Sequence, residues 1–116
     1  MKIAVPVDAE AVCPSFGRTP AFLLHDTDTL TTTTLENPAA QAEGGAGIQA
    51  AQFVVDQGAD VLITVRCGQN AADVLHAAGV AIYRADGENA AENLAKFRAG
   101  TLSALTQFHA GFHGIR

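Results

Sequence analysis

Two cysteines, Cys13 and Cys67, are the residues of this sequence best suited to bind a soft metal or to act as a nucleophile. Both roles need the thiolate form of the side chain, so the surroundings of each thiol decide its chemistry. Two thiols are too few for a disulfide scaffold, and a chain of 116 residues can build a sufficient core without one. The two cysteines are therefore the first candidates for a functional site.

Cys67 follows the apolar run 61–65 and precedes a predicted helix that starts near Asn70. A helix N-terminus stabilises negative charge, so we expect the pKa of this thiol to be lowered. The alternative is that Cys67 is a small buried apolar residue. Cys13 lies in the polar loop 8–19, where a cysteine is less common without a function, and we interpret it as functional.

Two histidines near the C-terminus, His109 and His113, are four residues apart, a spacing that places both imidazoles on one helix face. Such a pair could bind a metal, but nearby glycines oppose a helix, and a frayed terminus is the alternative interpretation. His25 and His76 end a predicted strand and a predicted helix on the side away from the loops, so we do not expect them to be ligands.

The stretch 44–47 (GGAG) opens a predicted helix with backbone N–H groups that no Cβ shields. It could accept an anion or the sulfides of a cluster, or the glycines could simply permit a tight entry into the helix. It lacks the lysine and Ser/Thr of a nucleotide-binding P-loop. Arg18, Gln49 and Arg66 could lie close by, although each type is also common as a solvated surface group.

The elements that must position these residues can be read from hydrophobic spacing and turn signals. We predict strands at 2–7, 21–25, 30–35, 61–65 and 80–83, and helices at about 45–58, 70–78 and 87–100. Asn70, with Asp73 three residues later, resembles a helix N-cap. Leu102, Leu105 and Phe108 give a short amphipathic piece after the last helix.

These elements predict an α/β fold with helices on both faces of a mixed sheet. If the second strand runs antiparallel to the first and the third returns as a hairpin, the other four strands run in one direction. The loops 8–19, 44–47 and 66–69 then meet at the carboxyl edge of the sheet, where open α/β sheets bind ligands. Both cysteines would lie at that edge.

Composition excludes several classes of protein. Hydrophobic residues make up 48% of the chain and charged residues 16%, which indicates one folded domain. Seven basic and twelve acidic residues give 7 − 12 = −5, without a basic cluster, so we expect no nucleic-acid partner. No apolar run approaches the ~20 residues of a membrane span, and the chain opens directly on a strand pattern. We therefore expect a cytoplasmic protein without a membrane partner.

Several segments together resemble the dinitrogenase iron-molybdenum cofactor biosynthesis family of nitrogenase accessory factors. They are 1–7 (MKIAVPV), 13–22 (CPSFGRTPAF), 37–39 (NPA), 45–51 (GAGIQAA) and 66–71 (RCGQNA). The resemblance implies a three-layer ribonuclease-H-like fold, with a five-stranded sheet of order 3-2-1-4-5 and an antiparallel second strand. It also implies a non-catalytic protein that binds and delivers an iron-sulfur or iron-molybdenum-type cluster, with cluster donor or acceptor proteins as partners. The oligomeric state stays open, and a homo-oligomer is one alternative.

Many relatives carry a histidine before the Phe-Gly pair, where this chain has Ser15, and a hydroxyl is a poor ligand for iron or molybdenum. Cluster binding is then expected to depend on the cysteines, helped by the C-terminal histidines, which suits a carrier that must release its cargo. The predicted cofactor-binding residues are Cys13, Ser15, Gly45, Gly47, Cys67 and Gly68, and the predicted metal ligands are Cys13, Cys67, His109 and His113.

We expect a single domain over residues 1–108 and a tail over 109–116. Two other functions are compatible with the same residues. One is a thiol redox switch in which Cys13 and Cys67 pair reversibly, which requires their Cα atoms to lie within ~7 Å. The other is an interaction module that binds a partner protein without metal.

Overall fold

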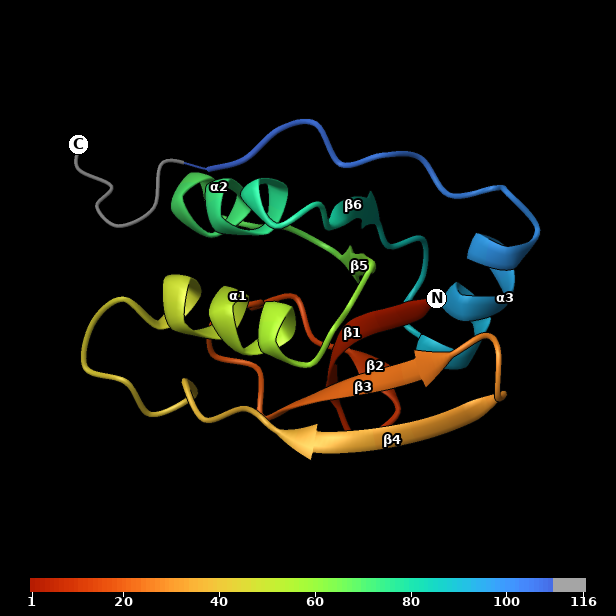
Figure 1. The fold of residues 1–116 in the computed structure, drawn as a ribbon, viewed down its shortest axis with the longest axis horizontal. Helices are drawn as coiled ribbons and strands as arrows, with labels where there is room; N and C mark the ends of the chain where they lie inside the picture. Colours follow the sequence, from red (N-terminus) through yellow and green to blue (C-terminus); the bar gives the residue numbers. More distant parts are fainter. Residues whose placement is uncertain (110–116) are drawn as a thin grey trace.

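The computed structural model describes residues 1–109, and Figure 1 shows the arrangement of its elements. In chain order they are β1 (Lys2–Asp8), β2 (Ala11–Val12), β3 (Ala21–Asp26), β4 (Thr31–Glu36), α1 (Ala46–Asp56), β5 (Val61–Thr64), α2 (Gln69–Ala77), β6 (Ala81–Arg84) and α3 (Ala90–Arg98).

The sheet has the order β4-β3-β1-β5-β6, with β2 paired to β1 outside this path. Strand β3 is antiparallel to β1 and to β4, whereas β5 is parallel to β1 and to β6. Strands β1, β4, β5 and β6 therefore run in one direction, which confirms the predicted topology. The short strand β2, antiparallel to β1, is an addition within the predicted loop 8–19.

Pro6 lies where β1 changes its neighbour. The first half of β1 pairs with β5 through Ile3 and Ala4, and its end pairs with β2 through Val7 and Asp8. Proline has no N–H to give to a ladder, so a position between two pairings costs little. The Pro6 carbonyl accepts the backbone N–H of Cys13 at 2.8 Å, which holds the start of the next loop against β1.

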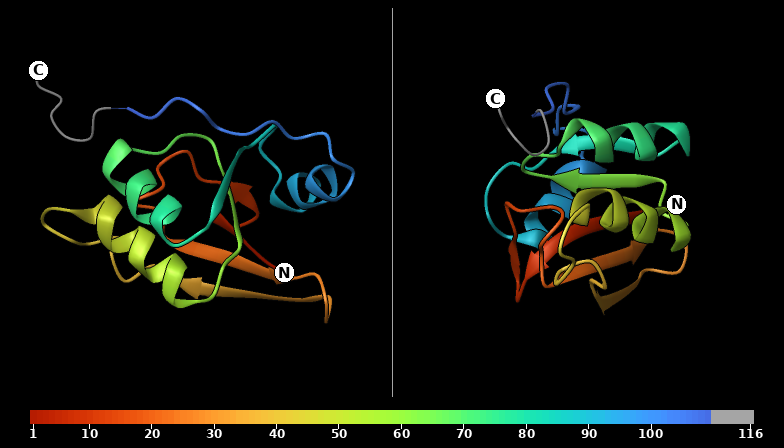
Figure 2. Two further views of the ribbon diagram at one scale, coloured as in Figure 1. Left: turned by 45° about the horizontal axis from the view of Figure 1, so that its top comes forward. Right: turned by 90° about the vertical axis from the view of Figure 1, so that its left-hand side faces the viewer.

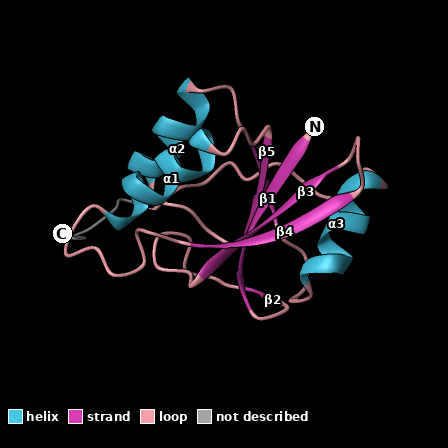
Figure 3. Cartoon of the chain, turned by 60° about the horizontal axis from the view of Figure 1, so that its bottom comes forward, coloured by secondary structure: helices cyan, strands magenta, loops and turns pink. Residues whose placement is uncertain are grey.

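The helices form the outer layers, as Figure 3 shows: α1 and α2 cover one face of the sheet, and α3 covers the other. The first face is packed mainly by alanines from the helices against Phe22 and Leu62 of the sheet. Small side chains let the helices lie close to the sheet. The second face is packed by β-branched residues of β1 and β5 against Leu94 of α3.

Helix α1 begins after Gly45, whose φ of 70° favours glycine. Helix α2 begins at Gln69 with Gly68 as its N-cap, so the prediction that Asn70 caps this helix is wrong. Neither helix has a side-chain cap or an acidic residue in its first turn, in contrast to α3, where the Asn89 side chain accepts the Glu92 N–H. Within the described residues, no helix combines the length and apolar character that a membrane crossing needs.

Residues 101–109, which we call the C-terminal strap, run back from α3 along β6 toward the first turn of α2 (Figure 2). The Arg84 N–H donates to the Ser103 carbonyl at 2.8 Å, and the Leu105 N–H donates to the Ile82 carbonyl at 2.9 Å. Through these bonds the strap covers the outer edge of the sheet at β6. The predicted amphipathic piece is thus extended rather than helical, and its apolar side chains Leu105 and Phe108 pack against the core.

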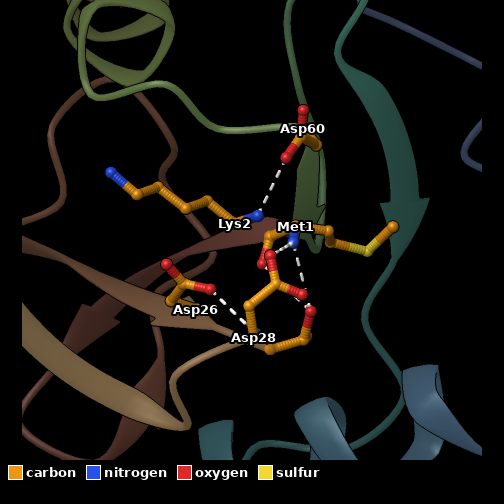
Figure 4. Close-up of polar contacts among 6 residues, drawn as sticks. Met1, Lys2, Asp26, Asp28 and Asp60 are labelled. Atoms are coloured by element: carbon orange, nitrogen blue, oxygen red, sulfur yellow. Dashed lines mark hydrogen bonds and ion pairs between the residues drawn. The ribbon is translucent and has the colours of Figure 1, made fainter.

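Carboxylates gather at the amino edge of the sheet, the end at which the parallel strands begin (Figure 4). The backbone N–H of Lys2 donates to Asp60 at 2.9 Å, and the N-terminal ammonium lies 3.2 Å from Asp28. The backbone N–H of Asp28 donates to the Asp26 carboxylate and lowers the pKa of that carboxyl. The amino edge of the sheet is therefore acidic.

Candidate functional site

A pocket of about 590 Å³ opens at the carboxyl edge of the sheet. Its wall combines the loop after β2, the start of α1, the β5–α2 loop and the end of the C-terminal strap. The lining residues are Pro14, Ser15, Phe16, Gly17, Arg18, Gly45, Ala46, Gly47, Ile48, Arg66, Gly68, Asn70, Ala71 and His109. The prediction that the three loops meet at this edge is confirmed, and α1 and α2 both begin on this side (left in Figure 1).

Asn37, directly after β4, holds the loop after β2 against the segment that leads to α1. Its side-chain amide donates to the carbonyls of Gly17 and Thr19, both at 3.0 Å, and its side-chain oxygen accepts the Ala39 N–H at 3.0 Å. The residue is buried. Sequence reasoning missed this role, because the Asn-Pro pair indicates only that the strand ends.

Gly17 permits the close approach of the loop to helix α1. A Cβ at this position would lie 2.9 Å from the nitrogen of Gly47 and 3.1 Å from its Cα. Next to it, Phe16 is buried and packs edge-to-face on Phe22, with ring centroids 5.5 Å apart. The loop is thus anchored in the core on one side of Gly17 and presses on α1 at Gly17 itself.

The side chains of the pocket are cationic or neutral. Arg18 and Arg66 line it together with His109, and no Asp or Glu does. Arg18 donates through Nη1 to the carbonyls of Ala40 and Ala42, which orients its guanidinium. Within residues 1–109, neither arginine forms an ion pair. A chain with a net charge of −5 therefore places two uncompensated cations at one edge.

Two helix N-termini add partial positive charge to the same wall. The backbone N–H groups of Ala46, Gly47 and Ile48 in α1 have no acceptor among the described residues, and neither do those of Asn70 and Ala71 in α2. Free N–H groups in a first turn, together with the helix dipole, favour an anion. The pocket is therefore suited to a negatively charged ligand.

Cys67 lies under the pocket rather than in its wall. Its side chain is 1% exposed and belongs to the core beneath α1 and α2. Desolvation raises the pKa of this thiol to about 12, so the expectation of a lowered pKa is wrong. Burial in the apolar core disfavours the charged thiolate. The alternative interpretation, a small buried apolar residue, describes Cys67 in this structure.

Cys13 is half-buried beside the pocket, next to the lining residue Pro14. Its thiol donates to the Ser15 carbonyl at 3.7 Å. The distance is near the limit for a sulfur donor, so this contact is weak. Cys13 is accordingly the more accessible of the two thiols, and both are free.

The other predicted site residues divide into two groups. Ser15, Gly45, Gly47, Gly68 and His109 line the pocket. His113 lies outside the described residues, so its predicted pairing with His109 stays a prediction. Within residues 1–109, no group of three or more His, Cys, Asp or Glu side chains is arranged to hold a metal ion.

The two thiols should differ in reactivity toward an alkylating reagent. With a pKa of about 12, Cys67 is ionised to roughly one part in ten thousand at pH 8, and burial also blocks access. We expect iodoacetamide to label Cys13 in the folded protein and Cys67 only after denaturation, as mass spectrometry of digested peptides would show. Equal labelling of both thiols in the folded protein would contradict the burial of Cys67.

Comparison with known proteins identifies the family. The sequence profile of the dinitrogenase iron-molybdenum cofactor family matches residues 1–100. The apo form of the orange protein from Desulfovibrio gigas is 30% identical, with a TM-score of 0.83 over 90% of this chain and 92% of that one. A NifB-like protein from Thermotoga is 33% identical, with a TM-score of 0.79 over 95% and 97% of the two chains.

A curated protein of Methanocaldococcus jannaschii is 28% identical over 88% of this chain and 89% of its own length. The family and the NifB-like structure link the chain to biosynthesis of the iron-molybdenum cofactor. The profile match spans most of the sequence, including the residues of all three pocket loops. This chain therefore belongs to the dinitrogenase iron-molybdenum cofactor family.

Proposed function

We propose that the protein binds an anionic metal–sulfur cluster, of iron-sulfur or iron-molybdenum type, in the pocket at the carboxyl edge and delivers it during cofactor biosynthesis. The observation that carries this proposal is the charge of the wall: Arg18, Arg66 and two open helix N-termini, without a carboxylate. Bridging sulfides together with anionic terminal ligands, sulfide or thiolate, outweigh the charge of the metals, so a cluster that carries such terminal ligands is an anion. N–H donors around the sulfurs also stabilise a bound cluster.

Binding by charge and N–H groups suits a carrier. A cluster held mainly by such contacts can leave without the breaking of several metal–thiolate bonds. Cys13, beside the pocket, is the thiol that could add one bond, whereas Cys67 would first have to leave the core. The role is non-catalytic, and the partners are the proteins that supply and accept the cluster.

The burial of Cys67 weighs against the thiol redox switch. A reversible disulfide needs both sulfurs within reach of each other and of a reductant. With Cys67 at 1% exposure in the α1/α2 core, this pairing would require local unfolding. A metal-independent interaction module gains no support from a specific feature of the pocket.

Tetrathiomolybdate is a suitable probe, because it is a simple soluble dianion of molybdenum and sulfide. We expect it to bind the wild-type protein, and we expect Arg66→Ala to weaken the affinity about tenfold through loss of one charge-assisted contact. Arg66→Lys should retain most of the binding. Equilibrium dialysis with molybdenum analysis measures each dissociation constant.

Arg98→Ala is the matched control, since Arg98 is exposed at the end of α3, away from the pocket. It removes the same charge from the chain and should leave the affinity within twofold. Rising salt should weaken wild-type binding, because the wall acts through charge. A wild-type protein that does not bind the dianion, or equal effects of Arg66→Ala and Arg98→Ala, would overturn the proposal.

A further inference from the structure

The C-terminal strap ends at the pocket and is fixed there by its backbone. His109 forms a parallel bridge with Gly68. The Gln69 N–H donates to the His109 carbonyl at 2.8 Å, and the His109 N–H donates to the Cys67 carbonyl at 3.3 Å. Neither bond involves the imidazole, so the position of residue 109 does not depend on its side chain.

The residue just before His109 contacts the core and α2. Phe108 packs on the core, and its ring lies edge-to-face with His76 of α2, with centroids 5.6 Å apart. The His109 imidazole then lies over Gly68, where an added Cβ would be 3.1 Å from Cε1 of the ring. Glycine at position 68 leaves room for the ring at the first turn of α2.

The His109 imidazole is unpaired within the part of the chain that the structure describes. Neither ring nitrogen of His109 has a hydrogen-bond partner within residues 1–109, and the side chain lines the pocket. The arginines of the wall can only donate hydrogen bonds, and serine and asparagine oxygens are weak ligands for iron. A neutral imidazole has a nitrogen lone pair that suits iron. His109 is therefore the strongest metal ligand among the side chains of the wall.

We propose that His109 binds the metal of the cargo through one imidazole–iron bond, while the cationic wall holds the sulfides. This inference rests on the proposed function and adds a point of attachment to it. In the step, the ring nitrogen donates its lone pair to Fe²⁺ and a water leaves the iron, and no electron is transferred. The ligand comes from the C-terminal strap, beyond the family match over residues 1–100.

Two probes distinguish the imidazole–iron bond from the electrostatic attraction of the cationic wall. In tetrathiomolybdate alone, sulfide fills every position on the metal, so an imidazole has no site to occupy. Its complex with ferrous iron, formed without oxygen, leaves open positions on the iron. We expect His109→Ala to bind tetrathiomolybdate within about threefold of wild type and to bind the iron complex at least tenfold more weakly than wild type does. Free imidazole should restore binding of the iron complex to this variant.

His76→Ala is the matched control, because it removes a histidine that contacts the same strap but does not line the pocket. It should bind both probes as wild type does. Three outcomes would overturn this inference alone, provided that the wild type binds both probes. In the first, His109→Ala binds both probes as tightly as wild type; in the second, it loses affinity for both probes equally. In the third, iron does not change the affinity of the wild-type protein. Failure of the wild type to bind tetrathiomolybdate would overturn the proposed function and this inference together.

Discussion

Replacement of Asn37 by alanine is expected to lower the free energy of unfolding by about 3 kcal/mol, because three hydrogen bonds, two of them buried and one partly buried, lose one partner. The alanine side chain has no donor for the carbonyls of Gly17 and Thr19. Because position 37 is buried, water cannot readily replace the lost amide. Asn37 connects the segment after β4 to the loop that lines the pocket. The loss should therefore also weaken binding of tetrathiomolybdate.

Urea denaturation followed by circular dichroism measures the change in stability. Asn70→Ala is the control, since Asn70 is exposed and its side chain makes no hydrogen bond within the described residues. An exposed substitution of this kind should change stability by less than about 0.5 kcal/mol. If Asn37→Ala cost as little as the control, the side chain would not hold the pocket loop against the segment after β4.

Gly17→Ala should cost about 2–3 kcal/mol and should also displace the start of helix α1. The new methyl group would meet the backbone at the start of α1: the nitrogen of Gly47 at 2.9 Å, its Cα at 3.1 Å and the carbonyl carbon of Ala46 at 3.2 Å. Backbone atoms of a helix cannot move aside as the tip of a flexible side chain can. The N–H groups of the first turn would shift, and anion affinity should fall.

Gly44→Ala tests whether this effect is specific to the close approach. Nothing lies within 4 Å of a Cβ at Gly44, and its φ is not positive. This variant should be neutral or slightly more stable, because alanine reduces the freedom of the unfolded chain. Thermal unfolding and dialysis against tetrathiomolybdate compare the two variants. Similar behaviour of both would contradict the contact between Gly17 and α1.

The sheet could be predicted because its signals are local. Each strand is a short apolar or β-branched run bounded by turns, and a hairpin at 26–31 fixes the relative directions of β3 and β4. Once the directions are known, the convergence of three loops at one edge follows from geometry. For the same reason the pocket-lining positions of Ser15, Gly45 and Gly68 could be anticipated.

The chemistry of the cysteines could not be predicted in the same way. A position before a helix indicates a lowered thiol pKa, but the direction of the shift depends on how closely distant residues cover the sulfur. Here Ala71 of α2 and Ala51 of α1 belong to the core that encloses Cys67. The sequence also carried no signal that the C-terminal strap would lie along β6, because its bonds to that strand are made by the backbone.

The way the C-terminal strap is attached makes the chemistry of the pocket at residue 109 independent of the stability of the fold. Since main-chain bonds alone hold residue 109 against the first turn of α2, any side chain can be presented there without rebuilding the domain. A single codon change would exchange a nitrogen donor for a thiol, a carboxylate or an inert methyl group. The same scaffold could in this way be retuned for a different metal.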